Sequence, residues 1–227
     1  MGEYDRVKDL HSWRSGWKIQ VKVLRKWRKV TEDDATIELI LCDAFVDKIE
    51  TTITEDLFEI FDHEIEENDW KILSTFSVCY NDRRLKHTDC DYRIRFINET
   101  TVENSAVISN NHFYDFQSFD RVFEEYHAVR NLPLDIMGEV VNVEPFLNVH
   151  DPNAEMPHEM IRILRFLSGV DIPCLAYNDL ADYFYNNWWS TGCHHVVAVL
   201  QFWHVKYQSG GNIIKLYDLS GRLFDSK

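Results

Sequence analysis

The chain has 227 residues and a mass of 27.0 kDa, a length that allows one or two domains. Hydrophobic residues make up 45 % of it, and there are only 8 Gly and 5 Pro, which excludes disordered, collagen-like and low-complexity proteins. The formal net charge of −14 argues against a polyanionic ligand, because nucleic-acid-binding domains usually carry a basic excess.

The negative charge is concentrated in one part of the chain. Residues 31–70 contain one Lys and fifteen Asp or Glu, a net charge of −14. Residues 1–30 carry +6, residues 71–100 carry +2 and residues 101–227 carry −8. The overall charge therefore limits the affinity for a polyanion without forbidding one, and such a ligand should bind away from the acidic helix expected at 55–67.

Targeting signals and metal motifs are missing from the sequence. No run reaches the roughly 18 apolar residues of a membrane span, and the first residues lack the order of a signal peptide, so we expect an intracellular protein without membrane contact. Five cysteines without a CxxC pair indicate reduced thiols. Cys193 precedes His194 and His195, but adjacent side chains of a strand point to opposite faces, and no HExxH, Walker or GxGxxG motif is present. We predict no catalytic residue, no metal and no cofactor.

Residues 1–104 are predicted to form a first domain of five strands and one helix. Apolar and polar residues alternate from Trp17 to Val23, as in a half-buried strand. Thr54 is a candidate N-cap for a helix that continues to about Glu67. The five strands are expected at 17–23, 35–42, 48–53, 71–80 and 92–97.

A connector at 105–131 is followed by a second domain at 132–227 with the same order. Strands are expected at 134–146, 160–167, 170–176, 195–207 and 213–217, with a helix at 179–189. Ile49, Leu57 and Phe61 match Ile172, Leu180 and Phe184 at a common offset of 123. Five strands with a helix between the third and fourth is the order of an OB-fold, so we predict a mostly β protein of two tandem OB-folds, which are five-stranded Greek-key barrels.

Seven segments of the sequence resemble plant homologues of the replication protein A large subunit, and this resemblance supports the prediction of two OB-folds. The segments are WKIQVKVLRKW at 17–27, IELILCD at 37–43, KIETTI at 48–53, YRIRF at 92–96, ETTV at 99–102, IMGEVVNV at 136–143 and VLQFWHVK at 199–206. The resemblance implies tandem OB-folds that bind single-stranded DNA in nuclear DNA replication, repair and recombination. It also implies the smaller replication protein A subunits as partners, while the zinc-bearing C-terminal domain of the full-length subunit has no counterpart here.

Binding of a single strand requires cations along the phosphates and aromatic rings under the bases. In the first domain a basic run with an interleaved Trp is expected at the end of the first strand and in the first loop. Its cations are Lys22, Arg25, Lys26, Arg28 and Lys29, and Trp27 lies among them. A second basic cluster comprises Arg83, Arg84 and Lys86 in the last inter-strand loop and Arg93 and Arg95 on the last strand. The alternative is a solvated strand face without a ligand, with Trp27 packed inward.

The expected stacking residues differ between the domains. By the resemblance, Thr54 and Leu85 stand where relatives place aromatic rings, which weakens the case for binding by the first domain. Tyr177 stands where they place a stacking Trp, and Tyr207 is a second candidate platform; the alternative for both is a buried aromatic at the rim. The nearest cations are Arg162 and Arg165.

We therefore expect a nuclear, non-enzymatic protein that binds single-stranded DNA with weak to moderate affinity and takes no small-molecule substrate. RNA stays open as a ligand, because stacking and phosphate contacts serve both nucleic acids. The alternative is an OB-fold protein–protein interaction module that has lost DNA binding and uses the acidic residues 32–69 as its partner surface.

Overall fold

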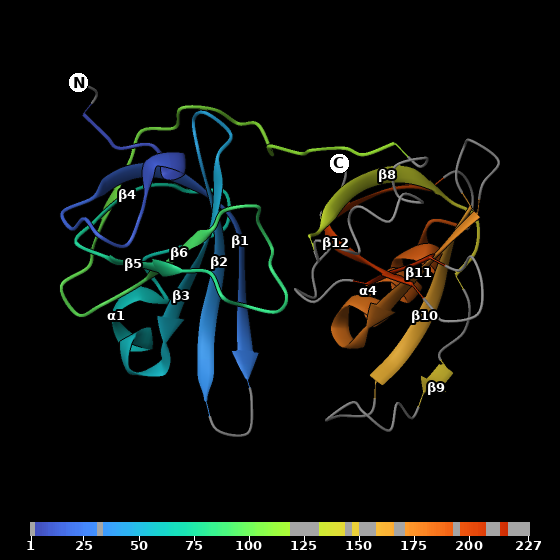
Figure 1. Cartoon of the computed structure of the whole chain (residues 1–227). Helices are drawn as coiled ribbons and strands as arrows, with labels where there is room; N and C mark the ends of the chain where they lie inside the picture. Colours follow the sequence, from blue (N-terminus) through green and yellow to red (C-terminus); the bar gives the residue numbers. More distant parts are fainter. Residues whose placement is uncertain are drawn as a thin grey trace. The chain divides into compact units, whose positions relative to one another are not determined.

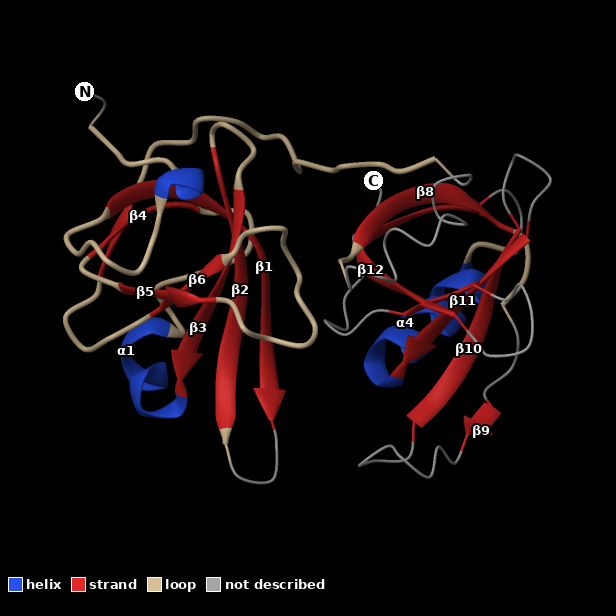
Figure 2. Cartoon of the chain, in the orientation of Figure 1, coloured by secondary structure: helices blue, strands red, loops and turns tan. Residues whose placement is uncertain are grey.

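The computed structural model describes residues 3–30, 34–118, 132–143, 147–149, 158–165, 171–192, 196–207 and 214–217. Its internal contacts divide the chain into two units, Met1–Phe113 and Tyr114–Lys227. Each unit is built mainly of strands, with a helix packed against a curled sheet (Figures 1 and 2). Within the described ranges, no helix has the length and apolar character needed to cross a bilayer.

The first unit consists of one seven-stranded sheet in the order β5-β6-β3-β2-β1-β4-β7. The strands are β1 (Lys18–Val30), β2 (Ala35–Asp43), β3 (Lys48–Thr54), β4 (Trp70–Ser74), β5 (Ser77–Tyr80), β6 (Tyr92–Arg95) and β7 (Thr101–Asn104). Three short helical segments accompany them: η1 (Val7–Asp9), η2 (Glu55–Leu57) and α1 (Phe58–Phe61). All strand pairs are antiparallel except β3 with β6.

A bend in the fourth predicted strand closes this sheet into a barrel. The run expected as one strand at 71–80 is two strands, because Thr75 has a φ of 56° between them. β4 pairs with β1, whereas β5 pairs with β6 at the other end of the sheet. The hydroxyl of Thr100 donates a hydrogen bond of 3.2 Å to the carbonyl of Thr75 and holds the bend. The result is the Greek-key barrel of an OB-fold.

The core of the first unit follows the predicted alternation. Trp17, Ile19, Val21 and Val23 are buried together with the apolar residues of β2 and β3, as the period of two requires. The alternation shifts at a bulge between Val23 and Arg25, so the residues after it change faces.

The helix expected at 54–67 is shorter than predicted. It spans η2 and α1, ends at Phe61, and has no side-chain cap from Thr54. The reason lies on β1, where the ammonium of Lys26 donates hydrogen bonds to the carbonyls of Asp62 and Ile65. These bonds satisfy carbonyls that a longer helix would have used internally.

The second unit has the same order of main elements along the chain. Its elements are β8 (Leu134–Val140), β9 (Leu147–Val149), β10 (His158–Arg165), β11 (Asp171–Tyr177), α4 (Asn178–Ser190), β12 (Val196–Tyr207) and β13 (Ile214–Tyr217). Of these, β9 is a short additional strand paired to β10. The sheet order is β8-β12-β13-β11-β10-β9, with β11 parallel to β13. The chain is therefore a pair of tandem OB-folds, as the order of elements predicts.

The fourth strand of the second unit is bent by the same device as that of the first. Phe202 has a φ of 62° where β12 changes partner from β8 to β13. The carboxylate of Asp135 accepts the backbone N–H of Phe202 at 2.9 Å and thereby fixes the bend. Two left-handed residues at equivalent positions support the internal duplication.

Candidate nucleic-acid interface

The outer face of the first barrel carries a row of paired residues across four strands. Trp27 on β1 is opposite Glu38 on β2, Glu38 is opposite Thr52 on β3, and Thr52 is opposite Arg95 on β6. Paired residues project to the same side of a sheet, so these four share one face. OB-folds bind oligonucleotides on this face and between the adjoining loops.

A second row lies beside the first and consists of Arg25, Ile40, Glu50 and Arg93. The middle of both rows is covered, since Glu38 is only 2 % exposed and Glu50 only 1 %. Carboxylates on the outside of a barrel should be solvated, and burial of a charge is costly unless it is paired. Another part of the chain must therefore cover and neutralise them.

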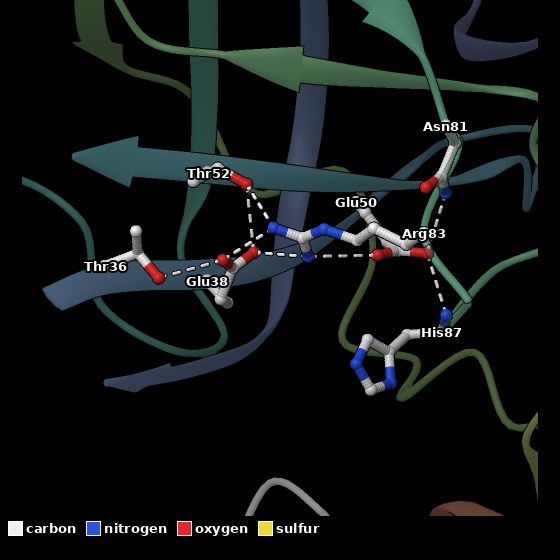
Figure 3. A network of polar contacts seen from close by, with 7 residues as sticks. All are labelled: Thr36, Glu38, Glu50, Thr52, Asn81, Arg83 and His87. Atoms are coloured by element: carbon white, nitrogen blue, oxygen red, sulfur yellow. Dashed lines mark hydrogen bonds and ion pairs between the residues drawn. The ribbon is translucent and has the colours of Figure 1, made fainter. Parts of the chain in front are cut away.

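The loop 81–91 between β5 and β6 is that part, and Arg83 is its anchor. The guanidinium of Arg83 donates two hydrogen bonds of 2.7 Å to the carboxylate of Glu38, one of 3.3 Å to Glu50 and one of 2.9 Å to the hydroxyl of Thr52 (Figure 3). Burial lowers the pKa of Arg83, but the hydrogen bonds and charges of the two glutamates outweigh it, so the pKa is raised.

Further contacts extend this loop across the face. Glu50 accepts the side-chain amide of Asn81 at 2.9 Å and the backbone N–H of His87 at 2.7 Å (Figure 3). The imidazole of His87 meets the indole of Trp27 edge to face, with ring centroids 5.2 Å apart. The loop therefore reaches from β3 to β1 and occupies the surface on which bases would stack.

Residues 105–113 cover the neighbouring part of the first unit. The indole N–H of Trp70 donates to the carbonyl of Ser109 at 2.9 Å, and the ammonium of Lys22 donates to the carbonyl of Asn111 at 2.7 Å. Burial lowers the pKa of Lys22. Residues 105–113, which the sequence places in a connector, thus pack on the first barrel, and 119–131 lie outside the described residues.

The basic run of the first unit lies on a strand, which corrects the expectation that it continues into a loop. β1 extends to Val30, which pairs with Ala35, because the alternation resumes after the bulge. Lys22 and Arg25 are buried, Trp27 is half-buried, and Arg28 and Lys29 are exposed. An exposed patch of all five residues is therefore not formed.

Arg28 projects from β1 away from the paired rows and binds an acidic partner. Arg28 and Lys26 both form ion pairs with Asp62, just beyond α1. The hydrogen bonds from Lys26 and Arg28 hold the pKa of Asp62 below its ordinary value. Part of the basic run is thus used to fix the acidic segment to the barrel.

The remaining cations of the first unit are differently exposed. Arg84 is exposed in the loop, Arg93 is half-buried on β6 and Arg95 is exposed. On the outer face, Lys29 and Arg95 are the exposed cations among the residues named for binding. Thr54 and Leu85, where aromatic rings were expected, are both half-buried.

A family model described as a domain of unknown function, DUF223, matches residues 8–125, which is more than half of the chain. The chain belongs to the DUF223 family. The match includes every strand of the first barrel together with loop 81–91 and residues 105–113, so both covering segments lie inside the DUF223 region. A comparison with curated proteins finds no match.

Solved structures similar to this DUF223 protein are OB-fold proteins of low sequence identity. A chain of a replication protein A heterotrimer bound to single-stranded DNA aligns at 17 % identity and a TM-score of 0.66, over 96 % of this chain and 50 % of that chain. The DUF223 protein thus spans about half of that chain's length. DNA-binding domain A of S. cerevisiae replication protein A aligns at 15 % identity over 47 % of this chain and 97 % of that chain, with a TM-score of 0.38. At 17 % identity, the similarity to the heterotrimer chain shows the fold alone. The alignment with DNA-binding domain A is too weak to show more.

The second barrel of the DUF223 protein places four predicted binding residues on strands. Arg162 is opposite Leu175, and Arg165 is opposite Asp171 beyond a register shift. Tyr177 is the last residue of β11, directly before α4. Tyr207 ends β12 opposite Ile214. The triplet from Cys193 to His195, considered above for metal binding, lies outside the described residues.

The strand alternation relates Arg162 to Tyr177. Cys174 and Ala176 on β11 are buried in the core of the second unit. Leu175 is paired with Arg162. Leu175 and Tyr177 occupy the positions of β11 that alternate with those of Cys174 and Ala176. β10 and β11 are the second and third strands of this OB-fold, so both residues stand on the strands that bind oligonucleotides in this fold.

Two functional residues of the first unit were missed by the sequence analysis. Glu38 and Glu50 each hold the loop on the outer face, although they were counted only as part of the acidic window. A signal existed, because Glu38 alternates with Ile37 and Leu39 in a strand whose inward positions are apolar. Glu38 and Glu50 lie on the same face of adjacent strands, and two such carboxylates predict a cation from elsewhere in the chain, but not which one.

Proposed function

We propose that this chain binds single-stranded DNA through its tandem OB-folds, without enzymatic activity, as a nuclear relative of the plant-type replication protein A large subunit. The observation that carries the proposal is the double OB-fold, which aligns over 96 % of the chain with a replication protein A chain bound to single-stranded DNA. Replication, repair and recombination are the processes in which it would act, with the smaller replication protein A subunits as partners.

The two barrels contribute unequally in this proposal. The sheet face of the first barrel is held by its own loop through Arg83, Glu38 and Glu50. The second barrel has Arg162 on β10 and Tyr177 at the end of β11. We assign the base stacking on the sheet face to the second barrel, where each stacked base contributes about 1–3 kcal/mol.

Charge supports a weak to moderate affinity. The acidic segment at 31–70 is partly neutralised internally, since Asp62 pairs with Lys26 and Arg28, and Glu38 and Glu50 pair with Arg83. Arg95 and Lys29 stay exposed on the outer face of the first barrel. A single strand would gain a few phosphate contacts and no more.

One observation favours a second candidate, an OB-fold module for protein contacts. Loop 81–91 lies across the outer face of the first barrel, from the contact of His87 with Trp27 to the hydrogen bond of Asn81 with Glu50. In this reading the exposed acidic residues around α1, such as Glu55 and Glu59, bind a basic partner.

Fluorescence anisotropy of a labelled single strand of about 30 nucleotides, titrated with the full chain at low salt, separates the two candidates. DNA binding predicts saturable binding that an unlabelled single strand reverses and a duplex of the same sequence reverses poorly. RNA of the same sequence measures the preference that the sequence leaves open. A flat titration at low salt overturns the proposal and leaves the interaction module.

A further inference from the structure

A row of aromatic rings lies exposed at one edge of the first barrel. Trp13, in the segment between η1 and β1, is 76 % exposed, and Tyr80, at the end of β5, is 60 % exposed. Tyr92 on β6 lies between them, with its ring centroid 5.9 Å from Trp13 and 6.1 Å from Tyr80. We call Trp13, Tyr92 and Tyr80 the aromatic row.

Trp13 is held in place although it contributes little to the core. Its indole stacks on the imidazole of His11 at 4.2 Å with an interplanar angle of 14°, and it forms a T-shaped pair with the ring of Tyr92 at an interplanar angle of 78°. Although one face of the indole lies against His11, Trp13 is 76 % exposed, so most of the ring is accessible to a ligand. A fully buried aromatic residue would stabilise the fold by about 1.5–3 kcal/mol, so exposure at this site needs another explanation.

A cation is associated with each end of the aromatic row: Arg14 follows Trp13 in the chain, and Lys86 lies near the ring of Tyr80. The guanidinium of Arg14 lies 3.8 Å from the ring centroid of Trp17 and forms an ion pair of 3.1 Å with Asp5. The ammonium of Lys86 lies 5.8 Å from the centroid of Tyr80 and 4.0 Å from the carboxylate of Asp91. Surface ion pairs of this kind contribute at most about 1 kcal/mol, so each cation can exchange its carboxylate for a phosphate.

The spacing of the row fits a short single strand. Trp13 and Tyr80 each lie within about 6 Å of Tyr92, so their rings are at most about 12 Å apart. That upper limit corresponds to at most about three nucleotides at the roughly 3.4 Å rise of stacked bases. Two bases could therefore lie on Trp13 and Tyr80 at once, with their phosphates near Arg14 and Lys86.

We propose that the aromatic row is a single-stranded nucleic-acid site of the first barrel, in which Trp13 and Tyr80 stack bases and Arg14 and Lys86 meet phosphates. The proposal rests on the proposed function and specifies where the first barrel makes its contacts. It replaces the sheet face, which loop 81–91 already covers. The row lies where β5 and β6 flank that loop, so a strand can reach it without displacing Arg83.

The test uses the full chain with a labelled oligothymidine and the variants Trp13→Leu, Trp13→Phe and Tyr80→Ala. Loss of a stacked base weakens binding about fivefold to a hundredfold, so Trp13→Leu and Tyr80→Ala should each fall in this range with the salt dependence unchanged. Trp13→Phe keeps a ring and should lose less. Ile60→Ala, which removes an exposed apolar side chain on α1, is the matched control and should bind like the wild type.

A second readout is specific to stacking. Oligothymidine should quench tryptophan fluorescence in the wild type, and the part of the quenching due to Trp13 should disappear in Trp13→Phe even where affinity is retained. Circular dichroism confirms that each variant is folded, which exposure of Trp13 and Tyr80 leads us to expect.

The outcomes separate the two proposals. If the wild type does not bind oligothymidine at low salt, the proposed function fails. If the wild type binds and Trp13→Leu and Tyr80→Ala bind equally well, the proposed function stands and the aromatic row is not the site.

Discussion

The guanidinium of Arg83 and the carboxylate of Glu38 are joined by two parallel hydrogen bonds, Nη1 to Oε2 and Nη2 to Oε1, each 2.7 Å long. This fork is the strongest geometry available to an Arg–carboxylate pair. It ties loop 81–91 to β2 on the face where OB-folds bind oligonucleotides. A cation that the sequence indicates as a phosphate ligand is thus engaged within the protein.

Removing this cation should destabilise the first barrel. Arg83→Ala leaves Glu38 and Glu50 buried without their counter-charge, and we expect a loss of about 2–3 kcal/mol, somewhat less than the 3–5 kcal/mol of a fully buried pair because Arg83 is 20 % exposed. Urea unfolding measures the change. Arg95→Ala, at an exposed position on β6, is the control and should change stability by less than about 0.5 kcal/mol. Equal stability of the two variants would contradict the role of the network.

The same variant distinguishes a structural arginine from a phosphate ligand. At a temperature where Arg83→Ala is folded, the slope of log affinity for single-stranded DNA against log salt should match the wild type. Arg162→Ala should lower the slope by about 0.7, the contribution of one phosphate contact on a single strand. A reduced slope in Arg83→Ala would mean that the loop opens and that Arg83 reaches the DNA.

Stacking by the second barrel gives a different signature. Tyr177→Ala should weaken binding about fivefold to a hundredfold with little change of the salt slope, because a stacked ring carries no counter-ion. Tyr177→Phe keeps the ring and should bind nearly as well as the wild type. Anisotropy titrations measure the DNA affinity of both variants. If the affinity falls equally in the two, the effect is due to the hydroxyl and not to the ring.

The ion pairs of Asp62 predict a pH dependence of stability. The pKa of Asp62 is held below its ordinary value of 3.8 by hydrogen bonds from Lys26 and Arg28. A carboxylate with a lowered folded-state pKa stabilises the fold above its unfolded pKa and loses that contribution as the pH falls through the folded value. The stability difference between wild type and Asp62→Asn should therefore be largest near neutral pH and shrink below about pH 4.

Lys26→Met provides the matched variant for this test. The hydrogen bond from Lys26 contributes most to the lowered pKa of Asp62, and Met keeps a similar side-chain length. Thermal unfolding between about pH 2.5 and 7 should show the acid-dependent loss reduced in Lys26→Met as well. If the difference between wild type and Asp62→Asn is the same at all pH values, Asp62 makes no charge-dependent contribution.

The end of α4 in the second barrel depends on one glycine. Gly192 has a φ of 71°, and no atom within 4 Å obstructs a side chain there. Gly192→Ala should therefore cost only the backbone strain of a left-handed alanine, about 1 kcal/mol, as measured by urea unfolding. Ser190→Ala, two residues earlier at an exposed position, is the control. No loss in Gly192→Ala would show that the helix end adjusts.

Local pattern predicts most of the fold and only part of the candidate site. The alternation around Ile19 and the helix between β11 and β12 follow from short segments, because each period reflects burial of one face. The bends at Thr75 and Phe202 do not, since neither residue type favours a left-handed conformation and tertiary closure imposes it.

Contacts distant in sequence explain what the pattern missed at the site. Arg83 meets Glu38 across 45 positions, and Lys22 meets Asn111 across 89, so neither partner can be identified from spacing. A basic residue on a strand looks the same in the sequence whether it faces solvent or a carboxylate. The aromatic row likewise joins Trp13 to Tyr80 and Tyr92 only after the barrel has closed.

The salt dependence of single-stranded DNA binding by the full chain tests the central claim most directly. With about four phosphates contacted, log affinity should fall against log salt with a slope near −3, since each contact on a single strand contributes about 0.7. Anisotropy from low to physiological salt measures it. Saturable binding with that slope supports a tandem OB-fold that holds single strands, whereas no binding even at the lowest salt contradicts the account.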